Sequence, residues 1–129
     1  MSAYLGTAWL EQPVDPAAEA LAAVDPTASA VIVRIVSGAP DGEARFTARV
    51  GGGAVAYEAG VDDAADLTLT DTYANAVAQL RGELDPNAAF MRGRTKVAGS
   101  TRVVLDLLAA TKTEPYHQAR TDLLAAVDL

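Results

Sequence analysis

The middle of the chain alternates between apolar and polar residues in a way that predicts an antiparallel β-sheet. Within Ala30–Val36, the run from Val31 to Val36 is β-branched apart from Arg34, which is typical of a central strand with most of both faces covered. From 43 to 50, small or apolar residues alternate with charged residues and threonine, as in a strand with one wet face. The buried set is Ala44, Phe46, Ala48 and Val50, and the wet set is Glu43, Arg45, Thr47 and Arg49. Three glycines, 51–53, turn the chain into a third strand, Ala54–Ala59.

Two further strands are expected later in the chain. Leu67 and Leu69 alternate with polar residues within Ala65–Thr70. Arg94–Ala98 is a shorter strand candidate, and Gly99 follows it. Together with the meander, these segments predict a sheet of five strands.

Helices are predicted where a capping residue precedes apolar positions at helical spacing. Asp15 followed by Pro16 is expected to start a helix through Val24. Asp71 is expected to cap a helix that carries Tyr73, Val77 and Leu80. The remaining predicted helices start at Asp85–Pro86, at Ser100 and near Pro115. The N-terminal segment Tyr4–Leu10 also has helix-like spacing with Trp9 as its anchor, and the last helix is expected to dock against the body.

Three motifs in the second half occur in the order found in a known family. They are ADLTLT at Ala65–Thr70, LRGELDPNAAFMRG at Leu80–Gly93, and GRTKVAGS at Gly93–Ser100. This stretch resembles the C-terminal half of the sterol carrier protein type 2 domain, and the N-terminal half matches by pattern only. The free-standing chain is similar to the bacterial stand-alone members.

The resemblance implies an α/β (α+β) fold with a five-stranded, twisted, mostly antiparallel sheet. Helices would cover one face of that sheet and enclose a hydrophobic tunnel, with residues 1–129 forming a single domain. Members of the family bind sterols, fatty acids, acyl thioesters or phospholipids without a cofactor. Eukaryotic members often end in a peroxisomal tripeptide, whereas this chain ends Val127, Asp128, Leu129, so no peroxisomal address is indicated.

Composition narrows the function classes. The net charge is −7, which opposes attraction to nucleic acid or to an anionic lipid surface. Cysteine is absent, which excludes thiol chemistry and suits a reducing compartment. Residues 1–10 lack the features of a targeting segment and no apolar run is long enough to cross a bilayer, so we expect a cytoplasmic protein that is not integral to a membrane.

No catalytic or metal-binding constellation is predicted. His117 is the only histidine, and a solvent-facing or capping role is expected for it. The acidic residues around the fourth strand lack the spacing of a calcium loop, so Asp66 is expected on the wet side of the strand and Asp71 at the helix start. The glycines at 51–53 precede a strand and not a helix, which indicates a hairpin turn and not a phosphate loop.

Two hypotheses for function follow. In the first, the protein carries an apolar ligand between the helices and the sheet, with no enzymatic activity, no cofactor and no metal. The hydrophobic walls would be Phe46, Leu67, Leu69, Val77, Leu80, Phe90, Met91, Val103, Val104, Leu107 and Leu108. In the second, the same residues form a filled core, and the protein is a non-catalytic accessory domain that docks a partner such as a lipid-metabolising enzyme. Either a monomer or a homodimer fits the sequence.

Overall fold

A five-stranded sheet forms the centre of the fold in the computed structural model, which describes residues 1–129. The strand order is β4-β3-β2-β5-β6, with β2 and β5 parallel and every other neighbouring pair antiparallel. The strands are β2 (Ala30–Ser37), β3 (Ala44–Gly51), β4 (Ala54–Ala59), β5 (Leu67–Thr72) and β6 (Lys96–Gly99). The predicted mostly antiparallel sheet is therefore confirmed.

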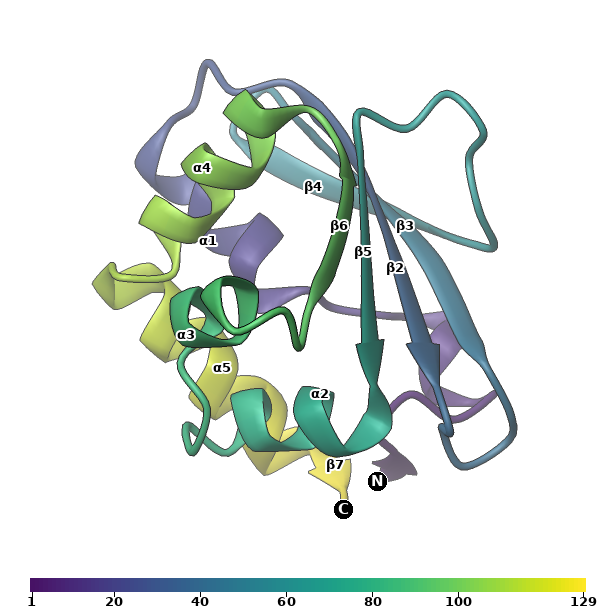
Figure 1. Cartoon of the computed structure of the whole chain (residues 1–129). Helices are drawn as coiled ribbons and strands as arrows, with labels where there is room; N and C mark the ends of the chain where they lie inside the picture. Colours follow the sequence, from purple (N-terminus) through teal and green to yellow (C-terminus); the bar gives the residue numbers. More distant parts are fainter.

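Five α-helices lie on one side of this sheet (Figure 1). They are α1 (Pro16–Val24), α2 (Tyr73–Leu80), α3 (Pro86–Met91), α4 (Thr101–Ala110) and α5 (Glu114–Ala126). The predicted caps of α1, α3 and α4 are confirmed, because the side chains of Asp15, Asp85 and Ser100 each accept a hydrogen bond from a backbone N–H of the first turn. None of the helices has the length and hydropathy needed to cross a bilayer.

The start of α2 differs from the sequence-based prediction. Its N-cap is Thr72, whose hydroxyl accepts a hydrogen bond from Asn75 N–H, and not Asp71. Strand β5 begins and ends two residues later than the expected Ala65–Thr70, which places Asp71 in the strand with only 5% of its surface exposed. Because alternate residues of a strand share a face, Asp71 lies on the same side as Leu67 and Leu69, toward the helices.

The N-terminal helix predicted for Tyr4–Leu10 does not form. Leu5 has a φ of 61°, in the left-handed region that a right-handed helix cannot use, and the helical part is the 3-10 turn η1 (Trp9–Glu11). Trp9 is nevertheless buried and packs edge-on against Phe46 at a centroid distance of 5.7 Å. Strand β1 (Ser2–Ala3) pairs in parallel with β7 (Val127–Asp128), so the two chain ends lie side by side (Figure 1).

The connection from β4 to β5 crosses the face of the sheet that the helices leave uncovered. The Gly60 carbonyl accepts a hydrogen bond from Thr47 Oγ1 at 2.8 Å, and the Asp62 carboxylate pairs with Arg49. Thr47 is completely buried as a result. The prediction that Thr47 lies on a wet face was wrong, because this connecting segment covers that part of the sheet.

Gly99 is fixed by the pairing of β5 with β6. Its φ is 120°, and a Cβ built there would lie 2.3 Å from the carbonyl oxygen of Asp66. The same oxygen accepts the N–H of Ser100 at 2.8 Å. Only glycine allows the backbones to approach this closely at the turn from β6 into α4.

Buried apolar side chains form two clusters on the helix side of the sheet. The first includes Ile32 and Leu67, four of the five alanines of α1 and the inner face of α4. The second surrounds Val36 and Phe46. Along β2, Arg34 lies between the strand positions of these two clusters.

Candidate functional site

A cavity lies between the inner face of the sheet and the helices, at the level of Arg34. Fifteen of its 24 lining residues are hydrophobic, and every α-helix and the strands β2, β3, β5 and β6 contribute to it. Its volume is about 80 Å³. This is room for a few water molecules and well below the ~300–1,000 Å³ of typical ligand pockets.

The structure brings together seven of the eleven predicted wall residues at this cavity. They are Phe46, Leu69, Leu80, Phe90, Val104, Leu107 and Leu108. They come from β3, β5, α2, α3 and α4, so segments far apart in the chain meet at one site.

The other four predicted wall residues do not line the cavity. Leu67 is fully buried in the first apolar cluster, and Val77 is half-buried on α2. Val103 borders a separate polar groove near Asp66. Met91 is 82% exposed, because it follows Phe90 in α3 and consecutive helical residues point about 100° apart.

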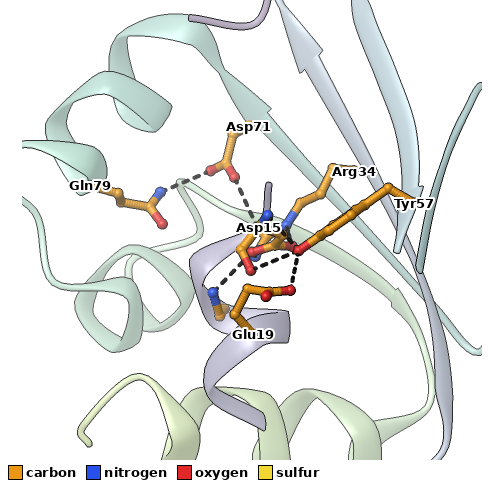
Figure 2. A network of polar contacts seen from close by, with 7 residues as sticks. Asp15, Glu19, Arg34, Tyr57, Asp71 and Gln79 are labelled. Atoms are coloured by element: carbon orange, nitrogen blue, oxygen red, sulfur yellow. Dashed lines mark hydrogen bonds and ion pairs between the residues drawn. The ribbon is translucent and has the colours of Figure 1, made fainter. Parts of the chain in front are cut away.

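A buried ion pair occupies one wall of the cavity. Arg34 donates to both carboxylate oxygens of Asp15, with Nε–Oδ2 at 2.8 Å and Nη2–Oδ1 at 3.2 Å. Figure 2 shows this pair linking β2 to the start of α1. Asp15 also caps α1 through Ala17 N–H, so one carboxylate starts a helix and neutralises a strand residue. Burial works against the charged guanidinium, but attraction and hydrogen bonds to Asp15 outweigh it and raise the pKa of Arg34.

Asp71 faces Arg34 from the neighbouring strand. Its Oδ1 accepts hydrogen bonds from Thr95 Oγ1 at 2.6 Å and from Gln79 Nε2 at 3.4 Å. Its Oδ2 lies 3.9 Å from Arg34 Nη1, which is an ion-pair distance but too long for a hydrogen bond. Arg34, Asp15 and Asp71 together carry one positive and two negative charges.

Tyrosines complete the polar part of the cavity region. The hydroxyl of Tyr57 accepts the N–H of Asp15 at 2.9 Å and donates to Glu19 at 2.7 Å (Figure 2). Burial and the negative charge of Asp15 raise the pKa of Tyr57 and of Tyr4, and burial raises the pKa of Tyr116 to about 12. These phenols are therefore neutral at physiological pH.

Sequence reasoning missed this polar cluster. Arg34 is the one charged residue in β2 and interrupts its β-branched run from Val31 to Val36, and such an interruption is the signal that could have identified it. The sequence predicts Asp71 as the cap of α2, which it is not, and Asp15 as the cap of α1, which is only one of its two roles. Neither prediction places these carboxylates beside Arg34.

The structure offers little for metal binding. No group of three or more histidine or acidic side chains is arranged to hold a metal ion, and His117 is exposed on α5.

The sequence comparison bears directly on the family. A model of the SCP-2 sterol transfer family matches residues 8–112, which is most of the chain. The chain belongs to this family. The match spans the cavity-lining residues from Val14 to Thr111, and these include the charged residues Asp15, Arg34 and Asp71. Comparison with curated proteins gave no match.

Solved structures confirm the SCP-2 fold. A conserved hypothetical protein from Thermus thermophilus, described as possibly a sterol carrier protein, aligns with a TM-score of 0.62 and 19% identity, covering 94% of this chain and 92% of its own. A structure of sterol carrier protein 2 aligns at 0.60 and 19% identity, covering 90% and 96%. The palmitated sterol carrier protein 2-like 2 from Aedes aegypti aligns at 0.57 and 20% identity, covering 69% and 81%.

Proposed function

We propose that this SCP-2 family protein binds an apolar ligand in the cavity between the helices and the sheet and carries it without chemical change. The ligand class would be a sterol, a fatty acid, an acyl thioester or a phospholipid. The observation that carries the proposal is the apolar cavity itself, which seven of the predicted wall residues line. The Aedes structure supports it, because that protein of the same fold is described as palmitated.

Burial of the ligand would supply the affinity. Each methylene moved out of water contributes about 0.8 kcal/mol, so a long acyl chain offers roughly 10 kcal/mol before the cost of lost freedom is subtracted. No activated side chain is needed. A cavity of about 80 Å³ must widen to admit such a chain, so helices or side chains of the apolar wall would have to move on binding.

The small cavity also favours a second candidate. A volume of about 80 Å³ lies closer to a packed core than to an open ligand site. In that case the protein would be a non-catalytic accessory domain that docks a partner. Ligand uptake distinguishes the two functions.

The first experiment is native mass spectrometry of the freshly purified protein, followed by extraction and identification of bound lipid. The carrier function predicts a co-purifying lipid, or uptake of a fluorescent fatty acid or sterol at micromolar concentration. A clean protein that takes up none of these probes at tens of micromolar contradicts the carrier function and favours the accessory domain.

A matched pair of variants on α4 locates the site. Leu108 lines the cavity and is half-buried, whereas Leu105 on the same helix is 55% exposed. Leu108→Trp should fill the cavity and lower uptake at least about tenfold, since a few lost methylene contacts are worth that much. Leu105→Trp should leave uptake unchanged. Equal effects from both variants would place the bound lipid elsewhere.

A further inference from the structure

Arg34 and Asp71 present unsatisfied hydrogen-bonding atoms to the cavity. Nη1 of Arg34 donates no hydrogen bond to the protein, because Asp15 takes only Nε and Nη2. Oδ2 of Asp71 accepts none, because both of its donors bind Oδ1. Both residues line the cavity, and these two atoms are 3.9 Å apart. A donor and an acceptor therefore stand side by side with nothing from the protein between them.

This spacing matches the chemistry of a hydroxyl group. An oxygen about 2.8 Å from each of two atoms fits where those atoms are 3.9 Å apart. A hydroxyl can accept from Arg34 Nη1 and donate to Asp71 Oδ2 at once. An ionised carboxylate can only accept, and it would add a third negative charge beside Asp15 and Asp71. An ether or ester oxygen would leave Asp71 Oδ2 without a donor.

The surroundings fit an amphipathic molecule. Leu69 and Phe46, the neighbours of Arg34 in β5 and β3, line the same cavity, and the apolar faces of α3 and α4 lie opposite. A ligand whose hydroxyl reached Arg34 would thus have its hydrocarbon part among apolar side chains. Water can occupy the hydroxyl position in the empty protein, and a ligand hydroxyl would replace it without loss of hydrogen bonds.

We propose that Arg34 Nη1 and Asp71 Oδ2 form a subsite that receives the hydroxyl of a neutral lipid and disfavours lipids that end in an ionised carboxylate. This inference rests on the proposed carrier function, since it concerns the head group of the carried molecule. It adds a selectivity that an apolar cavity alone would not have.

The test compares three ligands with the same hydrocarbon chain on the wild-type protein. Dodecan-1-ol, its methyl ether and dodecanoate are titrated at about pH 8, where the acid is ionised. The subsite predicts that the alcohol binds about 10- to 100-fold more tightly than either of the others, as expected for hydrogen bonds to charged groups. Equal affinity for all three overturns the subsite but leaves the carrier function standing. Binding of none of them, together with no uptake of the sterol and fatty-acid probes named above, contradicts the carrier function itself.

A variant pair assigns the selectivity to Asp71. Asp71→Asn keeps the side-chain shape but removes the negative charge, so the preference for alcohol over carboxylate should fall about tenfold or more. Asp63→Asn, in the exposed connection between β4 and β5, removes the same charge away from the cavity and should leave the preference unchanged. If both variants keep the wild-type preference, Asp71 is not part of the subsite. Should Asp71→Asn fail to fold, the wild-type ranking of alcohol against methyl ether still decides the proposal.

Discussion

Two neighbouring levels of the inner sheet face differ sharply in how they are packed. At one level, Ile32 pairs with Ala48 and Leu67, and all three side chains are fully buried among apolar neighbours. Two residues along β2, Arg34 pairs with Phe46 and Leu69 and borders a cavity. The same strands therefore build a dry core at one level and a polar-walled cavity at the next. Local sequence pattern does not separate them, because Leu67 and Leu69 look alike.

The largest expected effect comes from breaking the ion pair at the cavity level. Arg34→Met keeps most of the apolar stem but leaves Asp15 and Asp71 buried without a cationic partner. We expect the free energy of unfolding to fall by about 3–5 kcal/mol, as when one partner of a buried pair is removed. Urea denaturation measures this.

A compensated variant sharpens the interpretation. Replacing both carboxylates by amides in the Arg34→Met background removes the unpaired charges and should restore most of the lost stability. If stability stays as low as in the single variant, lost packing of the arginine stem and not unpaired charge is responsible.

The second prediction compares the two levels with one substitution on one strand. Leu67→Ala should lower the free energy of unfolding by about 2–5 kcal/mol, because it opens a void inside a closed core. Leu69→Ala should cost less, since that side chain already borders space, and it should increase the uptake of bulky ligands. Urea denaturation and ligand titration of both variants provide the check. Equal stability losses and equal uptake would mean that the two levels do not differ.

The third prediction concerns alkaline pH and Tyr116, which lines the cavity. Its pKa is raised from 10.0 to about 12, so between these values the unfolded chain loses a proton that the folded protein keeps. The contribution of Tyr116 to the free energy of unfolding is thus fully present below about pH 10. It is lost as the pH rises toward 12, by roughly 1–3 kcal/mol. Unfolding measured at several pH values should show a shallower decline in Tyr116→Phe than in the wild type. An identical decline in both proteins would show that ionisation of Tyr116 does not cause the loss of stability at alkaline pH.

The smallest effect is expected at Met91. Because this side chain is 82% exposed, Met91→Ser should change the free energy of unfolding by less than about 0.5 kcal/mol and leave ligand uptake unaltered. A clear loss of uptake would return Met91 to the site, through a rearrangement of α3 on binding.

The parts of the fold that could be predicted are those that depend on residues close in the chain. The caps are examples: Asp15, Asp85 and Ser100 each accept a hydrogen bond from a backbone N–H two or three residues ahead, and these predicted caps were confirmed. The predictions for Leu5 and Thr47 were wrong for different reasons. A left-handed backbone at Leu5 breaks the N-terminal helix, and a segment 13 residues away along the chain covers Thr47.

The polar half of the site could not be predicted in the same way. Arg34 meets Asp15 across 19 residues of sequence, and only the placement of α1 against the sheet brings them together. Asp71 joins them because β5 lies beside β2, a pairing that no local spacing encodes. Helical periodicity predicts which face of a helix points inward, but it does not show where that face borders a cavity, so the binding role of the apolar wall stays a prediction.

The double role of Asp15 has a consequence for the timing of local motions. One oxygen, Oδ1, accepts both Ala17 N–H at 3.0 Å and Arg34 Nη2 at 3.2 Å. Anything that steadies Arg34 in the cavity therefore also steadies the first turn of α1, and the amide hydrogen of Ala17 should exchange with solvent more slowly when the cavity is occupied. Ala17 lies at the start of α1 and Arg34 in the middle of the sheet. The exchange rate of one amide hydrogen at a helix end would therefore report whether the cavity inside the protein is occupied.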